Sequence, residues 1–373
     1  MTNTECRERR FVSHGGDVWG FARKYNIPLE ETLDFSGPIN HLGPSPKALE
    51  SVKENAKLIK FYPDPNPVEL LKSIVDYVNQ PGITMDNIIL GNGSIELIYM
   101  ITEIFSKIDF KAVVPVPSFT EYEKAALRIG GQPIYVQLPS DFSMENEKIK
   151  QAITPDTKIV SICNPHSPSG RLYFKDEILD LVEYCQKRNV IFSIDENYIE
   201  FTGKEQTETM AGYVNKYENL FVIRSVTKFY GMPGIRFGYG IAAKSLINKL
   251  LDVRQPWSIN SLAGFVTLAA FSDKEFIKNT KQTIVQERIK FAKQLIEIPG
   301  LHVFPSDANF LLVKITNDKI TSTKIKDELA QMGMLIRDCC TFVGLDNTYF
   351  RVTVRSDKDN QKLVDALKKL MIL

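Results

Sequence analysis

The segment with the clearest chemical potential runs from Phe221 to Gly240 and contains Lys228, which follows an apolar run. Ser225 and Thr227 precede the lysine, and Arg236 follows a turn rich in glycine and proline. A lysine amine can form a Schiff base with an aldehyde. Hydroxyls and a guanidinium can hydrogen-bond and neutralise a phosphate. The segment therefore predicts a site for a phosphate-bearing aldehyde cofactor, although a strand, a turn and surface cations would give the same local pattern.

Three polar residues elsewhere suit the same kind of cofactor. Asp195 ends the apolar run that begins at Val190, and a carboxylate there can keep a pyridine nitrogen protonated. Tyr198 and Asn164 could each hydrogen-bond an oxygen on the ring. Taken singly, Asp195 could equally be a helix cap or ion-pair partner, and Asn164 could be a turn asparagine.

Two further segments could hold the ring and its phosphate. Phe119 follows a proline-rich turn, where an aromatic side chain could stack on the ring face or simply pack in the core. Gly93 and Ser94 open a helical segment whose first N–H groups could bind a phosphate. The surrounding sequence is neither a Walker A motif nor a GxGxxG motif. By itself, this glycine loop is a weak signal.

The elements that must position these residues alternate between strand and helix. Strand-like runs are predicted at Ile88–Leu90, Lys111–Val114, Gln132–Val136, Thr157–Ile162, Val190–Ile194, Asn219–Ile223 and Phe237–Ala242. Helical patterns fill most of the intervals between these runs. This alternation predicts an α/β domain with a largely parallel sheet. Ligands of such sheets lie beyond the carboxyl ends of the strands, and Gly93, Asn164, Asp195 and Lys228 all fall there.

The pattern changes near residue 260. A long helical region is predicted over Ser261–Leu295, followed by short strands and two more helices. This part reads as a smaller α+β domain. We therefore expect an N-terminal arm and small-domain segment at 1–45, a large cofactor-binding domain at 46–258 and a small domain at 259–373.

Composition excludes several other classes of protein. The formal net charge is +1, which gives no electrostatic case for binding nucleic acid or an anionic membrane. No apolar run reaches the roughly 18 residues of a membrane span, and no apolar run follows the N-terminal arginines as in a secretory signal. The five cysteines form no CxxC pair. We expect reduced thiols, a cytoplasmic location and no metal site.

The order and spacing of these residues resemble those of the fold type I pyridoxal-phosphate enzymes, the aspartate-aminotransferase superfamily, over nearly the whole chain. The resemblance implies that fold, with pyridoxal 5'-phosphate as the cofactor. It also implies that Asp195 holds the pyridine nitrogen, that Lys228 forms the Schiff base, and that Ser225 and Arg236 bind the phosphate. By the same resemblance, Tyr62 reaches the phosphate of a neighbouring subunit, so a homodimer with shared active sites is expected.

The two ends of the chain narrow the resemblance. Ser13-His-Gly-Gly-Asp17, Leu33-Asp-Phe-Ser36 and Tyr349-Phe-Arg-Val-Thr-Val-Arg355 resemble segments of the threonine-phosphate decarboxylases of cobalamin side-chain synthesis, close relatives of the histidinol-phosphate aminotransferases. This implies that Arg351 binds the substrate carboxylate and that Arg337 and His14 bind its phosphate. Asn40 belongs to a loop expected to lie against the substrate, and Asn40 and Asn164 are both expected to bind the substrate.

Two loops depart from the decarboxylase pattern. Pro38 replaces an asparagine and removes an amide donor, and His166 and Ser167 give the Asn164 loop unusual side chains. These changes bear on which substrate is bound and leave the cofactor chemistry intact. L-threonine O-phosphate and L-serine O-phosphate differ by one methyl group, worth roughly 1–3 kcal/mol in an apolar pocket, so both stay candidate substrates. The alternatives are a histidinol-phosphate aminotransferase and, more remotely, a non-catalytic binding protein with this fold.

Overall fold

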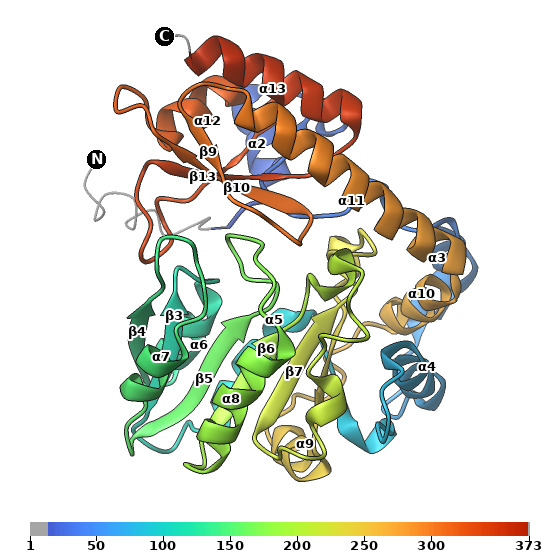
Figure 1. Cartoon of the computed structure of the whole chain (residues 1–373). Helices are drawn as coiled ribbons and strands as arrows, with labels where there is room; N and C mark the ends of the chain where they lie inside the picture. The colour runs from blue at the N-terminus through green and yellow to red at the C-terminus, as the bar shows by residue number, and fades with distance from the viewer. Residues whose placement is uncertain (1–13, 372–373) are drawn as a thin grey trace.

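The computed structural model describes residues 14–371, which form two units stacked one above the other (Figure 1). The larger unit contains the main sheet. The smaller unit combines the C-terminal third of the chain with a segment from near the N-terminus. Cys6 and the N-terminal arginines lie outside the described residues.

The large unit is built on a seven-stranded sheet with the order β2-β8-β7-β6-β5-β3-β4. All neighbouring pairs from β7 to β4 are parallel, whereas β8 is antiparallel to both of its neighbours. The prediction of a largely parallel sheet is therefore confirmed. The strands are β2 (Ile88–Gly91), β3 (Lys111–Val116), β4 (Gln132–Gln137), β5 (Thr157–Cys163), β6 (Ile191–Asp195), β7 (Leu220–Ser225) and β8 (Gly238–Ala242).

Helices cover the sheet because its central strands are apolar on both faces. Val222 and Ile223 of β7, for example, are fully buried. The covering helices are α4 (Val68–Val78), α5 (Ser94–Glu103), α6 (Glu121–Arg128), α7 (Asn146–Ala152), α8 (Lys175–Gln186) and α9 (Lys244–Leu251). Short 3-10 helices lie at Ala56–Lys60, Met85–Asn87, Ile199–Thr202, Ala211–Tyr213 and Pro233–Ile235.

The small unit has a core of its own around an antiparallel sheet with the order β12-β13-β10-β9. Its strands are β9 (Leu301–Val303), β10 (Phe310–Ile315), β12 (Arg337–Asp338) and β13 (Tyr349–Thr353), and its helices are α2 (Val18–Tyr25), α12 (Ser322–Gln331) and α13 (Asp357–Met371). A 3-10 turn at Leu29–Glu31 leads to β1 (Leu33–Asp34), which pairs in parallel with β11 (Met334–Leu335). Sequence patterns did not indicate the β1 pairing, which is continued by the N–H of Phe35 donating to the oxygen of Leu335 at 2.7 Å and leaves Ser36 in the lining of the same cavity as Arg337.

The predicted long helical region is two helices, α10 (Ser261–Ser272) and α11 (Lys274–Ile296). The break is at Asp273, whose carboxylate caps α11 by accepting the N–H of Phe276 at 3.2 Å. α10 packs on α3 (Pro46–Asn55) and α4 of the large unit. α11 then crosses to the small unit, as Figure 1 shows, and reaches its core at Phe291. The expected division at 259 thus falls just before α10.

Within residues 14–371, no helix is both long and apolar enough to cross a membrane. The same part of the chain contains no cluster of histidine, cysteine and carboxylate side chains that could hold a metal ion. Its four cysteines are buried free thiols, and none is in a disulfide.

Candidate active site

The predicted rim residues meet at the carboxyl ends of β5, β6 and β7. Cys163 pairs with Asp195, and Asp195 pairs with Ile223, so these three strands end at the same level. Asn164 follows β5, Asp195 ends β6 and Ser225 ends β7. β2 ends at this edge too, because Gly91 and Ser225 both lie opposite Gly238 of β8. Parallel strands therefore bring together residues far apart in sequence.

Lys228 lies three residues beyond the end of β7 and is partly buried. Its main-chain oxygen accepts the N–H groups of Asn40 and Gly231, which fixes the lysine backbone. Burial, together with the positive charges of Arg351 and Arg236, lowers the pKa of the Lys228 amine to about 8. Above that pH the amine is neutral and can attack a carbonyl carbon.

Asp195 is buried at the end of β6. Its Oδ1 accepts the backbone N–H of Asn197 at 2.9 Å, and its Oδ2 accepts the hydroxyl of Tyr122 at 3.0 Å. Burial raises the pKa of Asp195 to about 6 even though these hydrogen bonds favour the ionised form. A buried carboxylate with a raised pKa is suited to pair with a cationic ring nitrogen, which would restore the charge balance.

A cradle for a phosphate forms where α5 begins. Gly93 has φ +78°, and a Cβ there would lie 2.4 Å from Nη2 of Arg236, so only glycine lets the guanidinium approach the helix start. A Cβ at Gly238 would lie 2.6 Å from the backbone nitrogen of Ser94. The N-terminal N–H groups of α5, the Arg236 guanidinium and the Ser225 hydroxyl thus supply the donors that a phosphate group requires.

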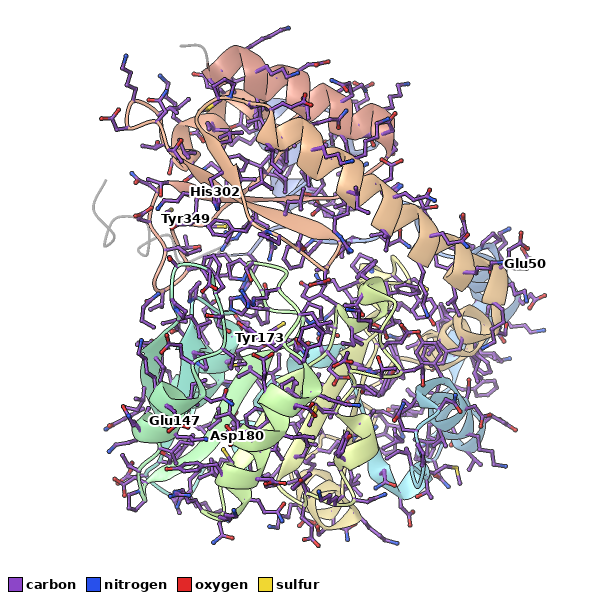
Figure 2. The ribbon with its side chains drawn as sticks, viewed as in Figure 1. Glu50, Glu147, Tyr173, Asp180, His302 and Tyr349 are labelled. Atoms are coloured by element: carbon purple, nitrogen blue, oxygen red, sulfur yellow. The ribbon has the colours of Figure 1, made fainter. Side chains whose placement is uncertain are left out.

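The other residues predicted to contact the cofactor ring are Asn164, Tyr198 and Phe119. Both polar groups of the Asn164 side chain bond to the backbone of Tyr173, at 2.8 and 3.0 Å, and its Nδ2 keeps a second hydrogen. Tyr173 lies where the large unit faces the small one (Figure 2). Tyr198 is buried, with its ring edge-to-face on Phe310 at 5.0 Å between centroids. Phe119 contacts the rings of His14 and Tyr122.

Two buried arginines lie opposite each other on the small unit. Arg337 of β12 is paired with Arg351 of β13, which places both side chains on one face of the sheet. Arg337 donates to the hydroxyl of Thr341 at 2.7 Å, and Arg351 donates to that of Ser167 at 3.1 Å. Within residues 14–371 neither forms an ion pair, and the Arg351 Nε has no hydrogen-bond partner. Two buried guanidiniums without ion-pair partners are suited to bind anions.

His14 begins the described part of the N-terminal arm. Its Nε2 lies 2.6 Å from Oε1 of Glu121. The following glycines let the arm lie flat on the Ser36 loop, because a Cβ at Gly15 would be 2.1 Å from the Ser36 oxygen. The N–H of Gly16 donates to the Ser36 hydroxyl at 2.7 Å. Close backbone contact therefore explains the glycine at Gly15, and the φ of +92° explains the glycine at Gly16.

A cavity of about 500 Å³ lies between the arm, α6 and β12. Positively charged or protonatable side chains from the arm, α2, α6, α12 and β12 line it: His14, Lys24, Lys124, Lys326 and Arg337. Acidic residues also line it, among them Asp17 and Glu123. His14 and Arg337, which lie 323 residues apart in the sequence, therefore line one cavity.

The side chain of Asn40 binds its own protein rather than facing the site as a substrate contact. Its Nδ2 donates to the oxygen of Phe229 at 2.9 Å and to the hydroxyl of Thr280 at 3.1 Å, which uses both amide hydrogens. Its Oδ1 accepts the N–H of Leu42 at 3.1 Å. The side chain therefore holds its loop beside Lys228 and has no donor left for a substrate.

Tyr62 lies apart from Lys228's group of residues. It is 81% exposed and packs only loosely, with its ring 5.1 Å from that of Trp257. Both line a second cavity of about 570 Å³ on the outside of the large unit. Within one chain, Tyr62 thus contributes to a surface and not to the cradle at Gly93.

The partners of three residues of the site were not predicted from the sequence. Tyr122 binds Asp195, Ser167 binds Arg351, and Glu121 binds His14. Glu121 is followed at i+3 by Lys124, a common helix pairing that gives no specific signal of function. Ser167 was noted in the sequence as part of the unusual Asn164 loop, but its partner Arg351 was not predicted.

The site can hold pyridoxal phosphate. Lys228 could hold the aldehyde carbon, Asp195 the ring nitrogen, and the cradle of Gly93, Ser94, Ser225, Thr227 and Arg236 the phosphate. The close approach of Arg236 to Gly93 is the observation that fits best, because it concentrates donors at the helix start.

Comparison with known proteins agrees with pyridoxal phosphate as the cofactor. Residues 33–367 match the family "Aminotransferase class I and II". The chain is 36% identical to the "Putative threonine-phosphate decarboxylase" of Caldanaerobacter subterraneus subsp. tengcongensis, over 98% of this chain and 96% of that protein.

Two solved structures are similar over nearly their whole lengths. The histidinol-phosphate aminotransferase of Clostridium acetobutylicum has a TM-score of 0.85 at 34% identity, covering 91% of this chain and 99% of that one. The L-threonine-O-3-phosphate decarboxylase of Porphyromonas gingivalis has a TM-score of 0.79 at 25% identity, covering 91% and 100%. The chain therefore belongs to the class I and II aminotransferase family, with the aspartate-aminotransferase-like fold type I and pyridoxal phosphate as its cofactor.

Proposed function

We propose that this enzyme decarboxylates an amino-acid O-phosphate, L-threonine O-phosphate or L-serine O-phosphate, to the corresponding amino-alcohol phosphate. The observation that carries the proposal is the pair of buried arginines, Arg337 and Arg351, which have no carboxylate partner within residues 14–371. A substrate with a carboxylate and a phosphate supplies one anion for each guanidinium.

The proposed roles follow from this arrangement. Arg351 binds the substrate carboxylate, while Arg337 and His14 bind its phosphate. Asp195 holds a proton on the ring nitrogen. When bound, pyridoxal phosphate supplies an electron sink for the charge that develops at Cα. The Cα–carboxylate bond would break and CO₂ would leave. Lys228, displaced from the cofactor by the substrate amino group and carrying the proton taken from that group, would then deliver this proton to Cα.

Orientation selects the reaction in this family of sites. The bond that breaks is the one held perpendicular to the ring, so the placement of the carboxylate by Arg351 decides between loss of CO₂ and loss of the Cα proton. Ser167, which binds Arg351 at 3.1 Å, belongs to the loop that departs from the decarboxylase pattern. We propose that this loop adjusts the carboxylate position.

A second candidate function is that of a histidinol-phosphate aminotransferase. The 34% identity to the Clostridium acetobutylicum enzyme favours it, and such an enzyme also acts on a phosphate ester. The two candidates differ in their products: the decarboxylase releases CO₂, whereas the aminotransferase passes the amino group to a 2-oxo acid.

A homodimer and a cytoplasmic location complete the proposal. Phe61, Tyr62 and Trp257 are 60%, 81% and 55% exposed and lie together, which is unusual for aromatic side chains and supports a subunit interface there. We propose that Tyr62 reaches the cofactor phosphate of the partner subunit. The product would serve corrinoid nucleotide-loop assembly.

The test measures kcat/KM of the purified, cofactor-loaded enzyme for each phospho-amino acid. The substrate with the higher value names the physiological class. If the enzyme turns over neither phospho-amino acid, the decarboxylase proposal is wrong.

A further inference from the structure

Glu121 connects three elements around the active site. Its Oε1 accepts from Nε2 of His14 at 2.6 Å and from Nζ of Lys124 at 2.7 Å. Its Oε2 accepts the hydroxyl of Tyr99, on α5, at 2.7 Å. The carboxylate thus joins the N-terminal arm to α5 and α6.

The charge on Glu121 fixes the donor in each of these bonds. The side chain is buried, and burial works to raise its pKa, but the hydrogen bonds from His14, Lys124 and Tyr99 outweigh burial and lower the pKa of Glu121 to about 2. An ionised carboxylate only accepts hydrogen bonds, so Nε2 of His14 must carry the hydrogen. Any contact between this ring and an anion is then made through Nδ1.

Two partners of Glu121, His14 and Lys124, line the cavity that contains Arg337. His14 comes from the arm and Lys124 from α6, so one carboxylate orients side chains on two sides of the same space. The ring of His14 also lies on Phe119, at 5.1 Å between centroids. The arm is held a second time at Gly15 and Gly16, against Ser36.

We propose that Glu121 is a positioning residue, which holds His14 and Lys124 at the cavity so that they meet the phosphate group of the substrate. This inference rests on the proposed function, since it assigns the cavity to a phosphate ester. With a phosphate oxygen on one side and the Glu121 carboxylate on the other, the imidazolium form of His14 can donate to both. Lys124, which sequence reasoning left without a role, becomes a second phosphate donor.

The test compares Glu121→Gln and Glu121→Ala with a matched control, Glu123→Gln. Glu123 is on the same helix and lines the same cavity, so the control removes the same charge. Three quantities are measured on cofactor-loaded enzyme: KM for the phospho-amino acid, kcat, and the inhibition constant of inorganic phosphate.

We expect Glu121→Ala to raise KM and the phosphate inhibition constant about tenfold or more, with kcat changed less than threefold. Glu121→Gln, whose amide oxygen still accepts one hydrogen bond, should lie between Ala and wild type. Glu123→Gln removes a negative charge from the lining of the same cavity, so it should not raise KM or the phosphate inhibition constant. Visible absorbance of the bound cofactor, unchanged in all variants, shows that the site is still assembled.

A double mutant tests the route of the effect. If Glu121 acts through His14, adding Glu121→Gln to His14→Ala should raise KM by less than Glu121→Gln does alone. Equal phosphate inhibition constants for Glu121→Ala and Glu123→Gln would overturn the inference. Failure of wild-type enzyme to release CO₂ would overturn the proposed function instead, and the phosphate inhibition constants would still be measurable against whatever phosphate ester it converts.

Discussion

The state of the Lys228 amine determines how fast the apoenzyme captures its cofactor. Its pKa is lowered from 10.5 to about 8 by burial first and then by the Arg351 and Arg236 charges. At pH 8 about half of such an amine is neutral, whereas an ordinary lysine at 10.5 is only about 0.3% neutral. The neutral fraction therefore differs by roughly 150-fold at that pH.

The corresponding experiment mixes apoenzyme with pyridoxal phosphate at a series of pH values and follows the visible absorbance of the bound cofactor. Because only the neutral amine attacks the aldehyde, the rate should rise with pH, pass its midpoint near 8 and level off above it. In Arg351→Met, the loss of one positive charge should move this midpoint upward. Lys228→Ala serves as the control that gives no covalent capture.

A rate that keeps rising to pH 10 in wild type would contradict the lowered pKa. A midpoint that falls in Arg351→Met would contradict the electrostatic part of the explanation. The two results are independent, because the wild-type midpoint tests the effect of burial on the Lys228 pKa and the Arg351→Met midpoint tests the effect of one neighbouring charge.

Further predictions concern binding and stability. Arg351→Lys should raise KM for the phospho-amino acid about tenfold, because an ammonium lacks the planar fork, and unchanged steady-state kinetics would move carboxylate binding elsewhere. Glu196 forms a buried ion pair with Arg224 at 2.9 Å, so Glu196→Gln leaves the guanidinium buried without a carboxylate. This substitution should lower the free energy of unfolding, measured in urea, by about 3–5 kcal/mol. A loss under about 1 kcal/mol would refute this prediction. Gly15→Ala should raise KM through displacement of the arm from Ser36, with little change in Tm.

Most of the strands and helices were predictable because apolar periodicity reports burial directly. The break at Asp273 was missed, since the flanking residues continue a helical pattern and one capping carboxylate decides the boundary. The two-residue strand β1 was missed because its two residues are too few for alternation to be visible. That pairing matters, because it leaves Ser36 in the lining of the same cavity as Arg337.

The positions of Asp195 and Lys228 followed from the rule that ligands lie at the carboxyl ends of parallel strands. The chemical type of a residue did not reveal its partner, however. Asn40 was expected at the substrate, but its amide is used by Phe229 and Thr280. Glu121 gave no signal, because its partner His14 lies 107 residues away in the sequence.

The measurement that tests the central claim most directly uses cofactor-loaded enzyme with each phospho-amino acid labelled in the carboxyl carbon. A parallel sample contains histidinol phosphate and 2-oxoglutarate. The account predicts labelled CO₂ in equal amount to an amino-alcohol phosphate, and no glutamate in the parallel sample. Glutamate formation without CO₂ release would contradict it and identify the enzyme as an aminotransferase.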